Sequence, residues 1–411
     1  MIDRFNKFKS LNYMEILIIL FPLSYLFRST ILNFFIILFS IIFLFNLKKH
    51  VKFLKNEIWI LFYLTFLFYL IFNSFFAVDF NSSLVSSLSQ VRYLLFSLFI
   101  FIAIKNINKF ETIIFFHSMI LILVSADTLF QFINNGVDIL GFYVPQNLNR
   151  LSGPFGDELI VGTYITYLSI PIISYSIFNF RDFQFKMKIY WIFFIFMVFL
   201  SVLLSGERMS SLILISSFIL ILLLSLPLKK SLVYIIFFLI SIFLSYSNIN
   251  QVKVRTNDFI SEIKLYKYNN HIRLFSSAYK IWESNKVNGV GLKNFRSTCD
   301  EKKFDDFTKT ETLCSSHPHN IYFELLSETG LIGILLFLFF ILSFFINYFR
   351  IPIKDKSIEY SILIGSLLVI FSYLWPVKSS GSFFSTFTAS FFWINIGYLL
   401  MLKRISQNKK N

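Results

Sequence analysis

The chain has 411 residues, of which 56% are hydrophobic, 20% are aromatic and only 15% are charged. This composition excludes a soluble globular domain, in which about a quarter of the residues are charged. The formal net charge of +15 would suit a nucleic-acid partner. However, the basic residues are sorted among the loops as membrane topology dictates, so we expect no nucleic-acid binding.

Apolar segments long enough to cross a bilayer recur along almost the whole chain. A helix of about 20 residues crosses the ~30 Å hydrocarbon core, where only helices or closed barrels satisfy the backbone. We therefore predict an all-α polytopic membrane protein with about 12 transmembrane helices, of which the first two are alternatively a hairpin. The predicted spans are 13–28, 30–46, 57–77, 91–105, 111–133, 157–178, 188–205, 209–227, 231–246, 319–348, 358–375 and 382–402.

The spans leave one long external loop, residues 247–318, between the ninth and tenth helices. Helices 1–9 are expected within 1–246, helices 10–12 within 319–402, and a cytoplasmic tail over 403–411. Inside the loop, residues 270–284 have apolar side chains at helical spacing, which predicts a helix on the membrane surface. No small-residue cleavage site follows the basic N-terminus, so we expect the first helix to be retained.

Basic residues gather in the loops on one side of the membrane. Of the 38 Lys and Arg residues, 21 lie in the termini and one set of loops, and 12 lie in the long loop, whose charge has little influence on topology. The positive-inside rule therefore places both termini in the cytoplasm. The short loops of the other set hold only Arg28, Arg92, Arg150, Arg208 and Lys378.

Four arginines at or near external helix ends are candidate anion ligands: Arg92, Arg150, Arg208 and Arg273. A guanidinium binds phosphate oxygens through a planar fork, and a helix N-terminus adds unpaired N–H groups. Taken singly, an arginine at such a position is more often an ordinary interface residue whose side chain reaches water. Because three of them are among the few basic residues of the short external loops, we interpret the group as a diphosphate-binding site and leave Arg28 as structural.

Asp127 lies inside the fifth predicted span, where an ionisable side chain is costly and usually has a partner within the bundle. It either anchors one of the arginines and so contributes to substrate binding, or forms a helix–helix hydrogen-bonding site with Gln131. The sequence leaves both interpretations open.

The two cysteines, Cys299 and Cys314, both lie in the long external loop. An oxidising compartment permits a disulfide between them, which would add about 3 kcal/mol to the order of the loop. Two free thiols are the alternative.

The densest polar stretch, SSHPHNIYFELLSETGLIG, covers residues 315–333 and opens the tenth span. If Pro318 takes the first helical position, as its fixed φ favours, His319 follows at the second position and faces the aqueous mouth of the helix. The helix dipole and nearby arginines then disfavour imidazolium, which leaves a neutral imidazole able to accept a proton. His317 is interpreted as an orienting or capping residue.

Behind the histidine, one face of the tenth span is polar. Asn320, Glu324, Ser327 and Glu328 lie within about 100° of helical arc, and we treat Asn320 and Glu324, with His317, as candidates for substrate binding. A solvated histidine without a role is the alternative for His319. The adjacent proline, the polar face and the basic neighbours favour a functional one.

The stretch HNIYFELLSETG, from His319 to Gly330, resembles the H-[NSQ]-x9-G signature of the O-antigen ligase and O-antigen polymerase family. Other landmarks follow in the family's order: RLSGPFGDELIVGTY, then Arg208 at the opening of a span, then an arginine ahead of AYKIWESNKVNGVGLKNF. The resemblance covers roughly residues 120–335. Glu207 departs from it, since typical members have a serine before this arginine, which puts the local pairing of Arg208 in doubt.

The resemblance implies a glycosyltransferase of lipopolysaccharide biosynthesis in the cell envelope, set in the bacterial cytoplasmic (inner) membrane among membrane lipids, with its active site on the periplasmic side. Such an enzyme moves a glycan from undecaprenyl pyrophosphate to an acceptor hydroxyl, without a metal or another cofactor. The acceptor is lipid A-core for a ligase and a second lipid-linked repeat unit for a polymerase. The sequence does not separate the two.

Within that reaction, His319 is expected to be the general base on the acceptor hydroxyl. Arg208 and Arg273 are expected to bind the diphosphate leaving group, whose charge grows in the transition state. Arg150 and Arg92 are further candidates for the same anion. A single displacement by the activated hydroxyl would invert the anomeric centre.

A transporter or flippase for lipid-linked oligosaccharide is the alternative, because a polytopic bundle with an anionic cargo suits it as well. Such a protein is expected to show repeats and broken helices with polar groups near the membrane midplane, whereas here the polar residues gather at one face. The chain has no D-x-D motif, no P-loop and no metal-type cluster of histidine and cysteine. We therefore expect no metal site.

Overall fold

The structure, a computed structural model, describes residues 8–145, 149–264, 269–301, 312–349, 353 and 357–408. The regular secondary structure of these residues consists of helices and one isolated antiparallel bridge between Val137 and Tyr143. The helices are α2 (Tyr13–Ser24), α3 (Arg28–Leu54), α4 (Ile58–Asn73), α5 (Phe80–Ser89), α6 (Val91–Ala103), α7 (Ile107–Ile133), α8 (Val161–Phe178), α9 (Phe185–Leu204), α10 (Arg208–Ser225), α11 (Leu228–Asn248), α12 (Asn250–Lys264), α13 (Asn270–Ser284), α14 (Phe295–Glu301), α15 (Ile321–Phe349), α16 (Ile358–Tyr373) and α17 (Thr386–Asn408). Short 3-10 turns are η1 (Tyr25–Phe27), η2 (Ser74–Phe76), η4 (Gly153–Phe155) and η5 (Phe180–Asp182).

The predicted class of fold, an all-helical multi-pass membrane protein, is confirmed. Each predicted span overlaps one of these helices. The described residues contain 9 candidate spans that are long and apolar enough to cross a membrane. The first candidate, Tyr13–Leu54, combines two predicted spans; α16 has 16 residues and is shorter than the candidates, and α17 is not among them. The count of twelve therefore stays a prediction.

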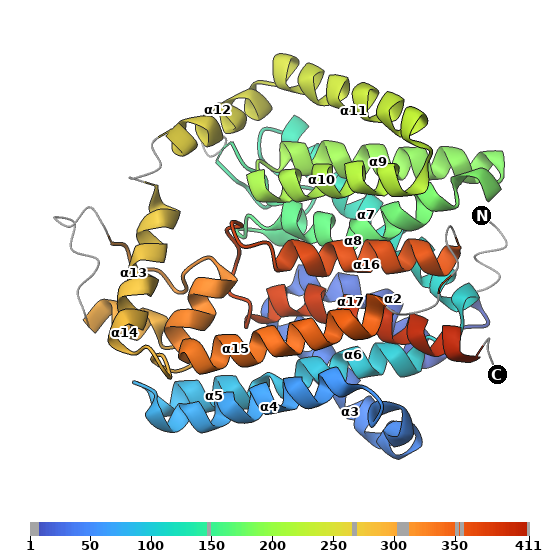
Figure 1. Cartoon of the computed structure of the whole chain (residues 1–411). Coiled ribbons are helices and arrows are strands. Elements are labelled where there is room, and N and C mark those ends of the chain that lie inside the picture. The colour runs from blue at the N-terminus through green and yellow to red at the C-terminus, as the bar shows by residue number, and fades with distance from the viewer. Residues whose placement is uncertain are drawn as a thin grey trace.

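The helices run side by side along one direction, and α12, α13 and α14 lie together at one end (Figure 1). We call this the loop end. At the opposite, terminal end, Lys109 Nζ donates to Ser10 Oγ at 3.0 Å, and Arg404 donates to the carbonyl of Ile104. Basic residues predicted on the cytoplasmic side, including Lys109 and Arg404, thus lie at the terminal end.

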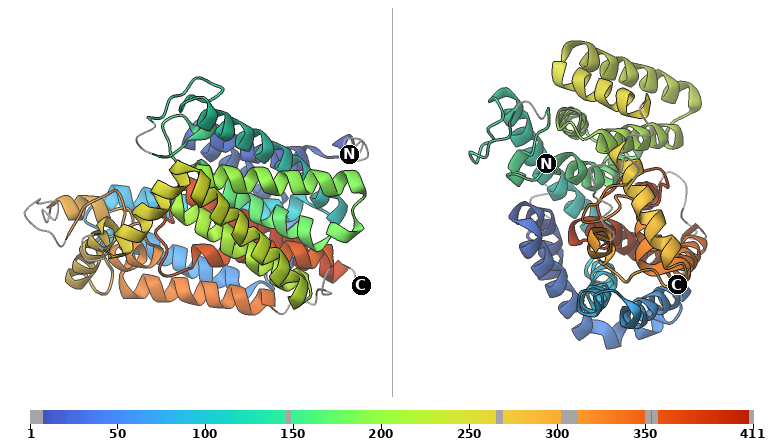
Figure 2. Two further views of the ribbon diagram at one scale, coloured as in Figure 1. Left: turned by 90° about the horizontal axis from the view of Figure 1, so that it is seen from above. Right: turned by 90° about the vertical axis from the view of Figure 1, so that its left-hand side faces the viewer.

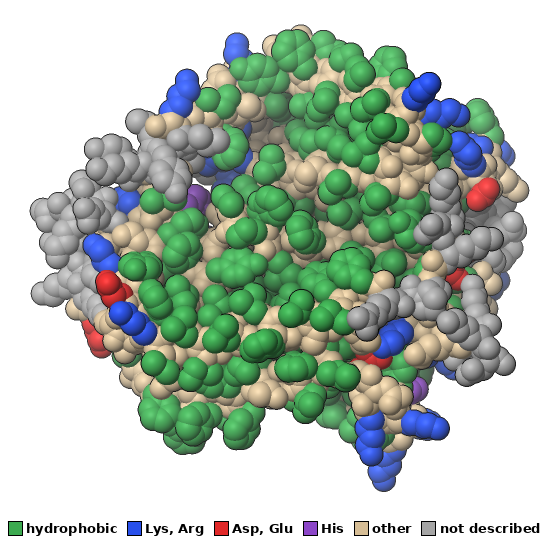
Figure 3. All heavy atoms as spheres, viewed as in Figure 1, with side chains coloured by type: hydrophobic (Ala, Val, Ile, Leu, Met, Phe, Trp, Pro, Cys, Tyr) green, Lys and Arg blue, Asp and Glu red, His purple; other side chains and the backbone are tan. Residues whose placement is uncertain are grey.

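The surface between the two ends is apolar. On the face in Figure 3, hydrophobic side chains cover the middle of the molecule, and Lys and Arg side chains gather toward both ends. α11 stands at the edge of the bundle (Figure 2), where only Ser231 and Ile235 of its side chains are buried. This distribution is the one that a bilayer requires around a helical bundle.

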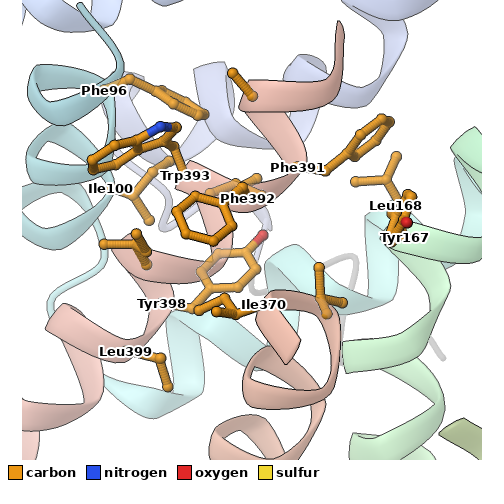
Figure 4. Close-up of a cluster of buried hydrophobic side chains, with 14 of the residues drawn as sticks. Phe96, Ile100, Tyr167, Leu168, Ile370, Phe391, Phe392, Trp393, Tyr398 and Leu399 are labelled. Carbon is orange, nitrogen blue, oxygen red and sulfur yellow. The ribbon is translucent and has the colours of Figure 1, made fainter. Parts of the chain in front are cut away.

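The core is aromatic and centres on α17. Its residues Phe392 and Trp393 pack between α6 and α16, among the side chains drawn in Figure 4. The backbones of α6 and α17 approach closely at Gly397, where an added Cβ would come within 2.6 Å of Ile100 Cβ and 2.9 Å of the Ser97 carbonyl. A small residue at the contact lets two membrane helices pack tightly.

α15 is broken near its beginning. Gly330 has φ 64°, outside the helical range, and an added Cβ there would come within 2.2 Å of the Val287 carbonyl. The break lets the segment 286–291 pair with the helix, through Val290 N to the Ser327 carbonyl at 3.0 Å. The first part of α15 is thereby fixed to the long loop, just behind His319.

Two predictions for the long loop are confirmed. The expected surface helix 270–284 is α13, which packs on α15 through stacked rings of Phe275 and Phe323, 4.7 Å between centroids. Cys299 and Cys314 form a disulfide, with their Cα atoms 5.8 Å apart. The covalent link ties α14 to the segment that leads to His319.

Candidate functional site

A cavity of about 340 Å³ lies at the loop end around His319, and we call it the histidine cavity. It is bounded by the beginnings of α8 and α10, by α12 and by the loop 374–385. Among the described residues, the charged and histidine side chains on its walls are Arg150, Glu207, Arg208, Arg255, His319 and Lys378. A hollow with basic side chains and a histidine at its edge is visible near this end in Figure 3. The fold therefore brings two predicted arginines to the predicted histidine.

His319 has a left-handed backbone conformation, with φ 57°, which few non-glycine residues adopt. Its carbonyl accepts a hydrogen bond from Ser380 N at 2.7 Å, which fastens the histidine to the loop 374–385. Its Nε2 lies 3.5 Å from Ser315 Oγ, at the limit of a hydrogen bond. Backbone outliers that the surroundings hold in place often mark functional sites.

The prediction that Pro318 begins the helix is wrong. α15 begins at Ile321, and the Asn320 side-chain oxygen accepts hydrogen bonds from first-turn N–H groups at 2.9 and 3.3 Å, as a helix N-cap does. The Asn320 amide also donates to the Pro376 carbonyl at 2.7 Å, so this residue is fixed from two sides. His319 consequently lies in the loop before the helix and not in its first turn, and Asn320 caps the helix.

Two more histidines surround His319. The ring of His317 lies 4.0 Å from the His319 ring and that of His271 lies 5.7 Å away, between centroids. Burial and then the charge of His271 hold the pKa of His319 below its ordinary value of 6.5. Burial, with the charges of His319 and Lys293, lowers the pKa of His317 to about 3. The neutral imidazole that we predicted agrees in direction, but burial and a neighbouring histidine cause it, and not the helix dipole.

Glu207, the residue that departs from the family pattern, couples α10 to the beginning of α8. Its carboxylate accepts hydrogen bonds from Gly162 N at 2.7 Å, from Thr163 N at 3.0 Å and from Thr163 Oγ1 at 2.6 Å. Burial raises the pKa of Glu207, and the hydrogen bond from Thr163 opposes that rise. The carboxylate thus accepts hydrogen bonds from N–H groups at the N-terminus of α8, where negative charge is favourable. Arg208 beside it lies over the ring of Phe259, with Cζ 5.7 Å from the centroid.

Arg150 and Arg255 line the cavity at a point where two loops pack closely against each other. Arg150 Nη2 donates to the Leu159 carbonyl at 2.6 Å, and Arg255 Nε donates to the Gly206 carbonyl at 3.1 Å. Gly206 has φ 71°, and an added Cβ would come within 2.3 Å of the Asn149 carbonyl. Glycine is required there because both the backbone conformation and the close approach exclude a side chain.

Lys378 is a buried cation on the cavity wall, with a relative exposure of 5%. Its Nζ donates to the Tyr167 hydroxyl and lies 4.3 Å from the Tyr373 ring centroid and 4.9 Å from that of Tyr167. Among the described residues, its side-chain partners are these two tyrosines. Burial lowers the pKa of Lys378 to about 7.

Arg92 and Arg273 do not line the histidine cavity. Arg273 Nη2 donates to the Thr312 carbonyl at 2.8 Å, and one turn later Ser277 Oγ donates to the Leu313 carbonyl at 2.7 Å. This face of α13 therefore holds the segment that leads to the histidine. Arg92 lies in a separate cavity, described below.

The two glutamates of α15 fix loops to the helix. Glu324 accepts hydrogen bonds from Ser382 Oγ and from Phe383 N, the latter at 2.8 Å, and Glu328 accepts one from Lys293 N at 2.9 Å. Both carboxylates are buried and do not line the histidine cavity. The polar face predicted for this helix thus faces protein loops.

Asp127 and Gln131 shape the loop after α7. Asp127 Oδ1 accepts a hydrogen bond from Ile139 N at 2.9 Å, and Gln131 Oε1 accepts from Ser152 N at 3.0 Å and Gly153 N at 2.9 Å. Among the described residues, no ion pair between Asp127 and an arginine is present. The hydrogen bonds of both residues go to loop backbone, and neither side chain pairs with the other.

A larger cavity of about 720 Å³ adjoins the histidine cavity, and we call it the apolar cavity. Arg208, Met209 and Ser379 line both cavities. The remaining wall is mostly apolar and aromatic, with side chains such as Leu212, Phe275 and Trp375. A charged cavity and an apolar one thus meet at Arg208.

Lys378, Arg255 and His271 are the site residues that sequence reasoning missed. Lys378 was among the few basic residues of the short external loops, and that scarcity was a usable signal. Arg255 is one of many basic residues in the long loop, and His271 follows no motif, so the sequence offered no signal for either. No group of three or more metal-ligating side chains occurs in the part of the chain that the structure describes.

Comparison with known proteins finds a match for a segment that carries part of this site. Residues 192–338 match the family model described as O-Antigen ligase. The matched segment contains Arg208, Arg255, Arg273 and His319, whereas no curated protein matches the chain. The chain is therefore a multi-pass helical membrane protein in which residues 192–338 are similar to the O-antigen ligase family.

Proposed function

We propose that this protein transfers a glycan from undecaprenyl pyrophosphate to an acceptor hydroxyl, in an inverting reaction without a metal. The observation that carries the proposal is the composition of the histidine cavity, where His319 shares the walls with Arg150, Arg208, Arg255 and Lys378. A base that is neutral at pH 7 and a set of cations are the two components that such a reaction needs.

His319 is the proposed general base. It accepts the proton of the acceptor hydroxyl while the hydroxyl oxygen forms a bond to the anomeric carbon of the donor sugar. The bond from that carbon to the diphosphate oxygen breaks, and the electron pair leaves with the lipid diphosphate. A pKa below 6.5 keeps the imidazole free to take the proton at neutral pH.

The cations are proposed to bind the diphosphate. Arg208 is placed between the charged and the apolar cavities, where the head of a lipid diphosphate and its chain would meet. Arg150, Arg255 and Lys378 would complete the anion site, because charge on the leaving oxygen grows in the transition state. Arg273, first proposed as a direct ligand, is better proposed to position the segment 312–319 through the Thr312 carbonyl.

The apolar cavity supports a lipid-linked donor. Its aromatic and aliphatic walls suit a polyprenyl chain, whose transfer from water is favourable by about 25 cal/mol per Å² buried. A flippase or transporter remains the second hypothesis from the sequence. The side chains singled out here gather at the loop end, which favours transfer at one membrane face over passage through the midplane.

The proposed setting is the bacterial inner membrane, with the termini in the cytoplasm and the loop end in the periplasm. The basic residues at the terminal end support this orientation. The disulfide between Cys299 and Cys314 supports an oxidising compartment at the loop end. The acceptor is lipid A-core or another lipid-linked repeat unit.

The test of the base is His319→Ala, assayed for glycan transfer in membranes. We expect transfer to fall at least a hundred-fold while the protein remains inserted at normal abundance. His50→Ala is the matched control, because His50 contacts the Phe101 ring edge-to-face near the terminal end and should leave transfer unchanged. Transfer retained in His319→Ala would remove the general-base assignment.

Deletion of the gene followed by glycan analysis separates ligase from polymerase. Full-length chains left on the lipid carrier indicate a ligase. Single repeat units attached to the final acceptor indicate a polymerase.

A further inference from the structure

A second polar cavity lies at the loop end, and we call it the Arg92 cavity. Its volume is about 390 Å³, and its walls come from the beginning of α3, the junction of α5 and α6, Lys293 and the segment 384–387. Its polar side chains include Arg92, Lys293, Asn33, Gln90, Ser89 and Thr386. The proposed reaction uses none of them.

In the described part of the chain, Arg92 is one of the two positively charged side chains that line this cavity. Its Nη2 donates to Tyr93 Oη at 2.9 Å and to Thr386 Oγ1 at 3.3 Å, while its Nε is buried without a hydrogen-bond partner among the described residues. No acidic side chain is among the described residues that line the cavity. A carboxylate is a ligand that a guanidinium without an acidic partner binds through strong charge-assisted hydrogen bonds.

Lys293 adds a second positive charge to the walls of the Arg92 cavity. Its Nζ donates to Ser382 Oγ at 2.6 Å, and the buried Glu324 and Glu328 lie close enough to interact with it electrostatically. The charge of Lys293 is thus partly balanced within the protein, and Arg92 is the principal anion ligand.

The remaining wall suits a sugar. Phe384 and Phe387 contribute aromatic rings to the wall, and the hydroxyl and amide groups of Ser89, Gln90 and Asn33 contribute hydrogen-bond donors and acceptors. Ligand sites typically combine apolar faces with a few placed polar groups of this kind. A phosphate ion alone would leave the aromatic rings and the amide groups of the wall without a ligand group to contact.

The Arg92 cavity and the histidine cavity share a wall. Ser385 lines the first and Thr388 lines the second, and their hydroxyl oxygens are 2.5 Å apart. Thr388 Oγ1 also donates to the Ser382 carbonyl at 2.6 Å, which keeps this wall ordered. A glycan whose reacting end is at His319 would therefore have its other sugars near Arg92.

We propose that the Arg92 cavity binds a carboxylate-bearing sugar of the glycan, at a position in the chain other than the one that reacts. The inference rests on the proposed function, since it needs a glycan at the histidine cavity, and it assigns acidic glycans as the substrate class. The anion that we predicted for Arg92 is then a sugar carboxylate and not the lipid diphosphate.

The test measures binding directly, by titration calorimetry on the full-length protein in detergent micelles. The probes are a glucuronic acid–glucose disaccharide and the matched neutral disaccharide cellobiose. We expect the acidic probe to bind at least ten-fold more tightly, and Arg92→Gln to abolish this preference. Arg28→Gln is the control, because Arg28 is an exposed arginine next to Ser29 of the cavity and pairs with Asp157 outside it.

Equal affinities for the two probes in the native protein, or a preference that survives Arg92→Gln, would overturn the proposal. If Arg92→Gln does not fold, Arg92→Lys supplies the measurement, because it keeps the charge but loses the fork, and we expect a loss of about three-fold or more. His319→Ala should bind the acidic probe as the native protein does. Transfer that persists in His319→Ala would remove the general-base assignment alone, and a native protein that transfers no glycan would overturn the proposed function alone, so these failures are distinguishable from loss of acidic-probe binding.

Discussion

Both ends of the bundle bury charged side chains, but they do so in opposite ways. At the terminal end, Lys403 Nζ lies 2.6 Å from Glu57 Oε1, and the same carboxylate accepts hydrogen bonds from Trp59 at 2.9 Å and Asn347 at 2.6 Å. At the loop end, the side chain of Lys378 contacts two tyrosines and no carboxylate among the described residues.

This difference indicates that the charge of Lys403 is structural, whereas the charge of Lys378 is available to bind a ligand. A buried ion pair with all its hydrogen bonds made is complete within the protein. A buried lysine beside neutral hydroxyls and rings bears the cost of burial without a counter-ion, and such perturbed groups in a cavity are candidates for binding or catalysis. Opposite responses to the same substitution should therefore distinguish Lys403 from Lys378.

The largest expected effect is the loss of stability on substituting Lys403 at the terminal end. Lys403→Met leaves the Glu57 carboxylate buried without its cation, and we expect a loss of about 3–5 kcal/mol in the free energy of unfolding. Lys378→Met removes a cation that has no carboxylate partner, so stability should stay the same or rise. Glycan transfer in Lys378→Met should fall by about a hundred-fold, because an anion ligand of the transition state is lost.

Unfolding in detergent, followed by tryptophan fluorescence, and transfer normalised to folded protein measure these two responses. If Lys378→Met unfolds as readily as Lys403→Met while its folded fraction transfers glycan normally, Lys378 is a structural residue. The comparison between the two ends would then fail.

A pH profile tests the same comparison with a smaller effect. His319 must be neutral, so kcat/KM should rise as pH increases through its pKa, which lies below 6.5. Lys378 must be charged to bind the diphosphate, so kcat/KM should fall as pH increases through about 7. We expect a narrow bell with a maximum between these values and a fall of about ten-fold toward pH 8.5. Lys378→Met should abolish the alkaline limb, and an unchanged limb would show that another group titrates there.

The smallest expected effect is that of Arg273→Lys. A lysine can still donate to the Thr312 carbonyl, so we expect kcat to fall by no more than a few-fold, with little change in the KM for the lipid-linked donor. Steady-state kinetics with the purified donor measure both parameters. A loss of a hundred-fold would mean that the guanidinium itself binds the diphosphate, as the sequence first suggested.

The sequence predicted which residues carry chemistry better than where they meet. His319 and Arg208 come together because each lies next to the beginning of a helix at the loop end, and Arg150 joins them from the loop between α7 and α8. Arg92 also lies at the beginning of a helix at the loop end, but the loop 374–385 passes between it and the histidine. No periodicity in the sequence reports the path of that loop.

Side-chain direction was the other unpredictable quantity. In the long loop, His271 faces the apolar cavity and Arg273, two residues later, faces the segment at Thr312, because successive helical residues point about 100° apart. The same argument applies to Glu324, which was predicted to face substrate and instead receives hydrogen bonds from the loop at Phe383. The positions of the helices could be predicted from the sequence, but the segments that each helix face contacts could not.

The disulfide between Cys299 and Cys314 makes assembly of the site dependent on the compartment. Its second cysteine precedes His319 in the same short segment, so the histidine acquires a covalent tether when the bond closes. On the proposed topology, that bond closes only after the long loop has crossed the membrane. If the proposed function holds, a newly made chain whose loop is still in the reducing cytoplasm has an untethered base and would not act on lipid-linked glycans at that face.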